Sequence, residues 1–199
     1  MTVLSGVSSF FGLDIGTTGM RLVELRGSGT TRSLVKYAYV PIDAKLSQSD
    51  SKVDQQKLSQ ILQNLIAEAR PTTKHVAVGI PSSRVFTTVV DFDHLSMSET
   101  AKAISYQADS LIPTPPAESK IDWSVLGDSP KDKTKVELLL SSVPNNFIES
   151  RLDMIESVGL NVIAFEPDSI ALSRALISPG SAGPQLIIDI GQQGTDLII

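Results

Sequence analysis

The start of the chain contains short runs rich in apolar residues, separated by turn residues, which is typical of β-strands. Residues 10–14, 20–25 and 33–40 are such runs, and a turn from Gly16 to Gly19 separates the first two, so we expect a hairpin followed by a third strand. Between residues 53 and 69 the apolar residues instead recur at spacings of three and four. This spacing places one apolar stripe on a helix, formed by Leu58, Ile61, Leu62, Leu65, Ile66 and Ala69.

The rest of the chain alternates strands with helices. Apolar runs between turn residues predict strands at 75–80, 85–92, 121–126, 135–142 and 160–165. Helices are expected at 96–111, 144–158 and 166–176, and the capping box of Ser96 and Glu99 opens the first of them. The strand, helix, strand, strand and helix after residue 83 read as a separate module, inserted between two parts of the domain that begins the chain.

Composition excludes several classes of protein. The 199 residues carry a net charge of −5, with scattered lysines and arginines, so no cationic face for nucleic acid is expected. The absence of cysteine excludes disulfides and thiolate metal sites. No basic segment precedes an apolar run, and no run approaches the ~18 residues of a membrane span. We therefore expect a cytoplasmic protein whose link to a membrane comes through a partner.

One short pattern occurs twice. Residues 10–18 read Phe-Phe-Gly-Leu-Asp-Ile-Gly-Thr-Thr, and residues 186–195 read Leu-Ile-Ile-Asp-Ile-Gly-Gln-Gln-Gly-Thr. An aspartate at a strand end can hold a hydrated divalent cation, and glycines let backbone N–H groups and threonine hydroxyls approach a phosphate. A single copy also fits any strand that ends in a tight turn. The pair together indicates a site for a polyphosphate.

Two such loops resemble those of the actin, Hsp70 and sugar-kinase superfamily, which clamp the phosphates of one ATP across a cleft. Residues 13–25 more specifically resemble the first phosphate segment of the PilM family of actin-like type IV pilus assembly proteins. Further PilM-like stretches follow in the same order, at residues 78–81, 106–113, 142–144, 158–160 and 165–176.

The resemblance implies an α/β chain with the actin-like (ribonuclease-H-like) ATPase fold, incomplete at the C-terminus, and an inserted SHS2-type βαββα subdomain as in FtsA. Its expected parts are actin-like subdomain 1A (1–82), SHS2-like subdomain 1C (83–158), a return to 1A with a hinge helix (159–180) and the start of subdomain 2A (181–199). The adenosine loop of the fold is missing, which indicates a truncation. We therefore expect this chain to bind nucleotide weakly or not at all and to be inactive.

The resemblance also assigns roles to residues, with ATP and Mg²⁺ as the cofactors. The expected phosphate-binding residues are Asp14, Gly16, Thr17, Thr18, Arg21, Asp189, Gly191 and Thr195, with Gln192 and Gln193 as further neighbours. Asp14 and Asp189 are expected to hold Mg²⁺ through water. Simple turn chemistry is the alternative for Thr17 and Thr18. Arg21 stands where the family usually carries a lysine, and a solvated charge at a strand end is its alternative.

Two acids lie at the start of the last predicted helix. The resemblance places Glu166 opposite the γ-phosphate, where it would orient the attacking water or a magnesium ligand as the catalytic residue. Acids at a helix start also favour the helix dipole, so a purely structural role stays open for Glu166 and Asp168. We expect ATPase activity to be weak at most, and whether ATP is hydrolysed at all stays open.

Three functions follow from these features. The first is a cytoplasmic ATP-binding scaffold of the type IV pilus, or of a related secretion system, at the inner-membrane assembly platform. It would bind the cytoplasmic tail of a PilN-like membrane protein as a peptide in a groove. The second is a small-molecule (sugar) kinase of the same superfamily, with Asp168 as general base. The third is an FtsA-like cell-division protein. We favour the scaffold because the insertion reads as an interaction module.

The scaffold hypothesis carries further expectations. The protein would lie at the inner face of the cytoplasmic membrane through its partners, without inserting into the bilayer. The pilus motor ATPases are additional candidate partners, nucleic acid is not, and self-association stays open.

Overall fold

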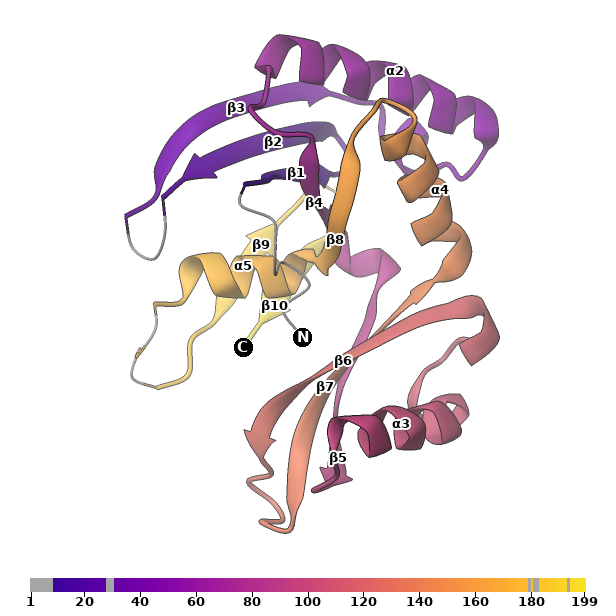
Figure 1. Cartoon of the computed structure of the whole chain (residues 1–199), viewed down its shortest axis with the longest axis vertical. Coiled ribbons are helices and arrows are strands. Elements are labelled where there is room, and N and C mark those ends of the chain that lie inside the picture. The colour runs from indigo at the N-terminus through magenta and orange to yellow at the C-terminus, as the bar shows by residue number, and fades with distance from the viewer. Residues whose placement is uncertain (1–8, 28–30, 179, 181–182, 193) are drawn as a thin grey trace. The chain divides into compact units, whose positions relative to one another are not determined.

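The computed structural model describes residues 9–27, 31–178, 180, 183–192 and 194–199. These residues form two compact units (Figure 1). The smaller unit consists of Ser83–Glu149. The larger unit contains the described residues up to Ser82 together with the described part of Ser150–Ile199.

A five-stranded mixed sheet is the centre of the larger unit. Its strand order is β3-β2-β1-β4-β8. The first three strands are antiparallel neighbours, whereas β1, β4 and β8 run parallel. Their bounds are β1 (Phe11–Ile15), β2 (Gly19–Arg26), β3 (Ser33–Pro41), β4 (His75–Ile80) and β8 (Asn161–Pro167). The predicted hairpin, third strand and later strands of this unit are thereby confirmed.

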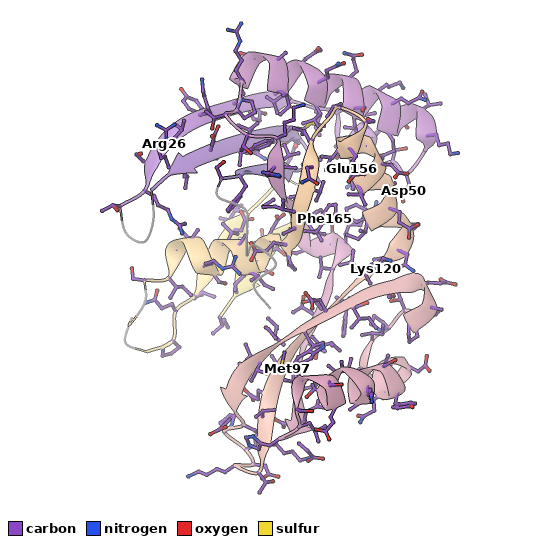
Figure 2. All side chains as sticks on the ribbon, in the orientation of Figure 1. Arg26, Asp50, Met97, Lys120, Glu156 and Phe165 are labelled. Carbon is purple, nitrogen blue, oxygen red and sulfur yellow. The ribbon has the colours of Figure 1, made fainter. Side chains whose placement is uncertain are left out.

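One face of this sheet is packed against helix α2 (Lys52–Ala69), which Figure 1 shows lying along it. Buried side chains alternate along β1, β2 and β4, as in Phe11, Leu13 and Ile15 of β1, and they meet Leu58, Leu62 and Leu65 of the helix. Phe165 of β8, labelled in Figure 2, packs against this core from its edge. The apolar stripe predicted for residues 53–69 is therefore the face of α2 that packs on the sheet and completes the core.

The helix ends have specific causes. The side chain of Ser51 accepts a hydrogen bond from the backbone of Asp54 at the start of α2, and Arg70 ends the helix in the left-handed conformation, with φ of 49°. The short helix α1 (Ala44–Gln48), which the sequence did not predict, is capped in the same way by Asp43.

The opposite face of the sheet carries helix α5 (Asp168–Leu176), which contacts β4, β8 and a two-stranded sheet. That sheet pairs β9 (Ile187–Ile190) with β10 (Thr195–Ile198). The sequence predicted a helix start at Glu166. The structure corrects this start, since Glu166 and Pro167 still belong to β8 and a residue before proline is held extended.

The smaller unit is a three-stranded antiparallel sheet of order β5-β7-β6 covered by a helix. Its strands β5 (Phe86–Asp93), β6 (Ser119–Asp128) and β7 (Lys135–Pro144) enclose a core with helix α3 (Met97–Leu111). Short 3-10 turns occur at Ser82–Arg84 (η1) and Pro116–Glu118 (η2). The capping box of Ser96 and Glu99 is confirmed.

Helix α4 (Asn145–Glu156) follows β7, begins in the smaller unit and ends in the larger one. The elements from β5 to α4 thus occur in the order strand, helix, strand, strand, helix. Their assignment as an SHS2-type subdomain and the division of the chain at residues 82, 158 and 180 stay predictions. Within the described residues, the structure has no helix both long and apolar enough to span a bilayer.

Candidate phosphate and cation site

The two copies of the repeated sequence are closed by the same type of backbone hydrogen bond. In the first loop, between β1 and β2, the backbone N–H of Gly16 donates to the carbonyl of Gly19 at 3.0 Å. In the second loop, between β9 and β10, the N–H of Gly191 donates to the carbonyl of Gly194 at 2.9 Å. In each loop the aspartate therefore lies two residues before the glycine whose N–H donates the closing hydrogen bond.

These hydrogen bonds determine which backbone N–H groups of the loops are available to bind a phosphate. The N–H of Gly16 is used within the first loop, and so is that of Gly191 within the second. Among the described residues, no acceptor is found for the backbone N–H groups of Thr17 and Thr18, which leaves them as the donors of the first loop. The carbonyls of both threonines hold the loop in place, because Ile42 N–H donates to Thr18 and the Ser47 hydroxyl donates to Thr17.

In the second loop, Gly191, Gln192 and Thr195 are all exposed. Gln193 lies outside the described residues. The binding roles expected for Gly191, Thr195, Thr17 and Thr18 stay predictions.

A row of residues crosses the sheet at the level of the first loop. Asp14 of β1 lies opposite Arg21 of β2, which lies opposite Tyr39 of β3. On the other side of β1, Leu13 is paired with Val78 of β4, so the next position along β4 is Gly79, and Gly79 is paired with Glu166 of β8. The residues proposed from distant motifs thus share one line across five strands.

Arg21 is bound within this row. Its Nη1 donates to Oδ2 of Asp14 at 2.8 Å, and its guanidinium lies 5.5 Å from the centre of the Tyr39 ring. Both charged side chains are partly exposed, at 49% for Arg21 and 39% for Asp14. A cation at Asp14 would therefore have to share that carboxylate with Arg21 or displace it.

Asp168 occupies the space that Gly79 leaves open. A Cβ on Gly79 would overlap Oδ1 of Asp168, so only glycine at this position admits the carboxyl group. The sequence analysis assigned no site role to Gly79, and it proposed a catalytic role for Asp168 only under the kinase hypothesis. The first turn of α5 thus delivers an acid to the end of β4, beside the row that contains Asp14.

The surroundings of Asp168 disfavour its negative charge. Burial raises the pKa of its carboxyl group, and the carboxylates of Asp14, Asp189 and Asp196 raise it further, from the ordinary 3.8 to about 7. Acids from both loops therefore contribute to the raised pKa of this one carboxyl group. Asp168 can therefore exchange a proton near neutral pH, which is the property of a general base.

The second loop lacks the positive charge of the first. Asp196 lies opposite Asp189 in the ladder of β9 and β10, in the position that Arg21 has opposite Asp14. Two like charges on opposite strands destabilise a sheet. The sequence analysis missed Asp196, although it follows Asp189 at the same spacing at which Arg21 follows Asp14.

The described residues offer no complete set of protein ligands for a metal ion. In the part of the chain that the structure describes, no group of three His, Cys, Asp or Glu side chains is placed to bind a metal ion. A cation at Asp189 and Asp196 would need water or phosphate oxygens to complete its coordination, as Mg²⁺ commonly does.

Glu166 has a different partner from the one expected. Its Oε1 forms an ion pair with Nη2 of Arg174 at 2.6 Å, so its carboxylate is neutralised by the same helix that carries Asp168. The catalytic role of Glu166 stays a prediction. The structure offers Asp168 as the acid with the altered proton affinity.

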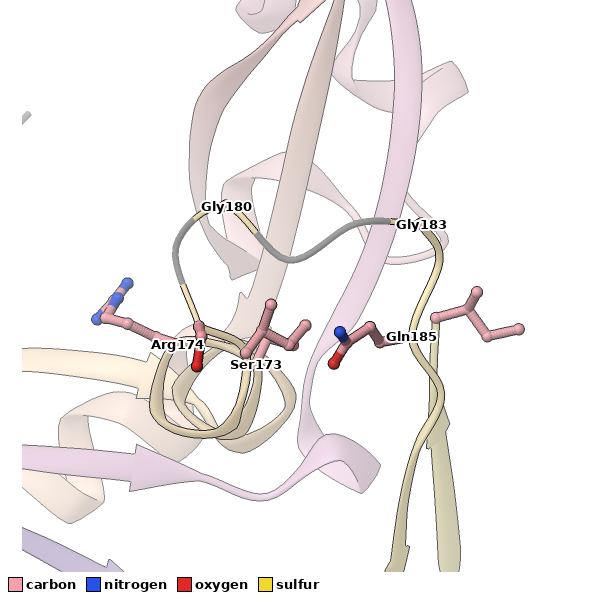
Figure 3. A pocket seen from close by; sticks show the side chains of 8 residues that line it. Ser173, Arg174, Gly180, Gly183 and Gln185 are labelled. Atoms are coloured by element: carbon pink, nitrogen blue, oxygen red, sulfur yellow. The ribbon is translucent and has the colours of Figure 1, made fainter.

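An open hollow of about 540 Å³ lies between the end of α5 and the end of β10 (Figure 3). Its lining residues are Ser173, Arg174, Ile177, Ser178, Gly180, Gly183, Gln185 and Ile199. None of the four clustered aspartates lines it, so it is separate from the candidate phosphate site.

Comparison with known families identifies the chain. The family described as type IV pilus assembly protein PilM matches residues 12–199. The chain belongs to the PilM family. The predicted family is thereby confirmed.

Two solved structures are similar to this PilM-family chain. The first is described as a PilM-PilN type IV pilus biogenesis complex, with a TM-score of 0.82 and 22% identity over 95% of this chain and 57% of the other. The second is the cytoplasmic domain of EpsL, an inner-membrane component of the type II secretion system of Vibrio cholerae. Its TM-score is 0.51, with 14% identity over 82% of this chain and 59% of the other.

At these identities the similarity shows the fold. The actin-like fold predicted from the paired loops is confirmed by the family match and by the first structure. The chain spans less than three fifths of the length of either structure.

Proposed function

We propose that this protein is a scaffold of type IV pilus assembly that binds the cytoplasmic segment of a PilN-like inner-membrane protein. The match of the PilM family over residues 12–199 carries this proposal. The similar fold of a PilM that is found in complex with PilN supports the choice of partner. Both observations favour the scaffold over the sugar kinase and the FtsA-like protein. Such a scaffold works in the cytoplasm, at the membrane through its partner.

A direct binding experiment tests the partner. The full-length protein is titrated by calorimetry with a peptide covering the cytoplasmic segment of the PilN-like protein encoded in the same genome. A peptide of the same composition in scrambled order is the control. Saturable binding of the first peptide alone is expected. Equal binding of both peptides, or of neither, would refute the scaffold as proposed.

We further propose that the two loops bind the phosphates of ATP together with Mg²⁺. The first loop presents the N–H groups of Thr17 and Thr18 beside the Arg21 guanidinium, which suits phosphate oxygens. The second loop presents the uncompensated pair Asp189 and Asp196, which suits a hydrated divalent cation. When bound, Mg²⁺ would supply charge neutralisation for the phosphates.

The different charges of the loops give this proposal a spatial test. Mn²⁺ is used in place of Mg²⁺, and the broadening of backbone amide signals is measured by NMR with and without ATP. Stronger broadening is expected at Asp189 and Asp196 than at Thr17. The variant Asp196→Asn should weaken the broadening at the second loop. Broadening centred on the first loop would contradict the assignment.

Asp168 is the proposed acceptor of a proton from a water molecule that attacks the γ-phosphate. Its pKa of about 7 leaves it partly ionised at neutral pH, and it is surrounded by the acids of both loops. Any ATP hydrolysis by the full-length protein should therefore be lost in Asp168→Asn but retained in Glu166→Gln. Hydrolysis that is retained in Asp168→Asn and lost in Glu166→Gln would instead support Glu166 as the catalytic residue.

A further inference from the structure

Tyr39 is an exposed aromatic residue that contacts the first loop. It lies on β3, the edge strand of the sheet, and is 55% exposed. Its ring nevertheless lies against Gly19, beneath the guanidinium of Arg21, and its hydroxyl is 3.5 Å from the carbonyl of Thr18. Tyr39 thus contacts Thr18 and Gly19 of the loop and Arg21 of the strand that follows it.

Gly19 makes room for the ring. A Cβ at this position would overlap Cε2 of Tyr39 and would crowd its Cζ and hydroxyl. The carbonyl of Gly19 also accepts the N–H of Gly16 that closes the turn. Gly19 therefore both closes the first loop and leaves room for the ring of Tyr39.

The position of Arg21 is fixed from two sides. The ring of Tyr39 supports one side of the guanidinium, and Nη1 reaches Asp14 and passes close to Gly16, where a Cβ would be 3.1 Å away. Within the described residues, Asp14 is the single ion-pair partner of Arg21. A guanidinium has five N–H donors in one plane, so several remain for an additional anion.

Stacking and hydrogen bonding do not compete in an arginine. The ring uses the flat face of the guanidinium, whereas phosphate oxygens bind at its edge. A side chain that is held in advance also loses less conformational entropy when an anion binds. A lysine can also contact a ring through its ammonium group, but it has no planar group that stacks on the ring while its N–H donors stay at the edge.

We propose that Tyr39 is a positioning residue, which holds the Arg21 guanidinium over the first loop so that its remaining N–H groups receive a phosphate group of the ligand. This inference rests on the proposed phosphate site. It adds a residue that contacts no ligand itself and that acts through Arg21.

The test measures the binding of magnesium tripolyphosphate, and of Mg-ATP, to the full-length protein by calorimetry. Tyr39→Leu is expected to weaken binding about two- to fivefold, as the loss of an exposed cation–π contact would. Tyr39→Phe keeps the ring and should bind like the wild type. Tyr37→Leu is the matched control, because Tyr37 is 74% exposed on the same face of the same strand, opposite Val23. It should leave binding unchanged.

A double-mutant cycle separates positioning from a general structural effect. The same measurements are made in the Arg21→Gln background at low ionic strength, where weak binding of an anion is strengthened. Tyr39→Leu should then have no additional effect, because the group that it positions is gone. An equal loss in both backgrounds would overturn the proposal.

The outcomes also distinguish this inference from the function on which it rests. Wild-type protein that binds neither ligand would refute the phosphate site and the role of Tyr39 together. Wild-type binding that Tyr39→Leu leaves unchanged would refute the role of Tyr39 alone. Neither result affects the binding of the PilN-like segment, which is measured separately.

Discussion

Ionisation of Asp168 should make the larger unit less stable as the pH rises. The folded protein raises the pKa of this carboxyl group from 3.8 to about 7, first through burial and then through the carboxylates of Asp14, Asp189 and Asp196. Between these two values the folded chain holds a proton that the unfolded chain has released. The stabilising effect of protonation is therefore complete below about pH 4 and is lost as the pH rises to about 7.

The expected size of this effect is modest but measurable. A difference from 3.8 to about 7 corresponds to at most about 4 kcal/mol of unfolding free energy. Water reaches this partly exposed side chain and screens the neighbouring charges, so we expect about 2 kcal/mol. The variant Asp168→Asn keeps the shape of the side chain and removes its charge. It should lack this part of the pH dependence and be more stable than the wild type at pH 8 by a similar amount.

Amide hydrogen exchange of Val76 and Val78 is a suitable assay, since both residues are buried in β4 beside Gly79. Trp123 belongs to the smaller unit, so its fluorescence would not report on Asp168. The free energy from exchange is compared between wild type and Asp168→Asn at several values from pH 4.5 to 8. The carboxyl carbon of Asp168 is titrated by NMR in parallel.

Asp196→Asn is the control for the cause of the shift. It removes one of the three neighbouring charges and should lower the pKa of Asp168 without restoring it to 3.8, because burial is the larger cause. A carboxyl group that titrates near 4 in the wild type would refute the reasoning. So would a free-energy difference between wild type and Asp168→Asn that is constant over the whole pH range.

Three other substitutions test separate contacts. Gly79→Ala should push the Asp168 carboxyl group into solvent, since a methyl group would overlap it, and NMR titration should then show a lower pKa for Asp168. Glu24→Ala should cost about 1–3 kcal/mol in urea unfolding, because the buried Glu24 carboxylate accepts hydrogen bonds from both the N–H and the hydroxyl of Thr72. Ser96→Ala removes the N-terminal cap of α3 and should cost about 1 kcal/mol, measured by Trp123 fluorescence in urea. Each expectation would be contradicted if the measurement named for it showed no change.

Much of the fold could be predicted because burial imposes a period on the sequence. The three- and four-residue spacing of Leu58, Leu62 and Leu65 predicted α2, and these side chains are its buried face. Helix α1 was missed because five residues are too few to show a period, and its start depends on the single side chain of Asp43. The start of α5 was misplaced because Pro167 fits the first turn of a helix as well as the end of a strand.

The site was predictable only where one segment carries its own signal. Asp14 and Asp189 could be proposed from the sequence because each lies in a complete motif. Gly79 gave no such signal, since its role depends on Asp168, which is far away in the sequence and adjacent only in the folded unit. Asp196 could have been found by aligning the two loops beyond their glycines, where it takes the position of Arg21.

That alignment also exposes a difference in charge between the two loops. Both loops close with the same type of backbone hydrogen bond, but the residue opposite the aspartate is an arginine in the first and an aspartate in the second. The arginine of the first loop offsets its aspartate and favours an anion, whereas the second loop has two acids and favours a cation. The pKa of Asp168 is raised by Asp14 of the first loop segment and by Asp189 and Asp196 of the second, so this carboxyl group is influenced by both. A phosphate that brings its own divalent cation would satisfy both loops at once, which neither a free phosphate nor a free cation could do.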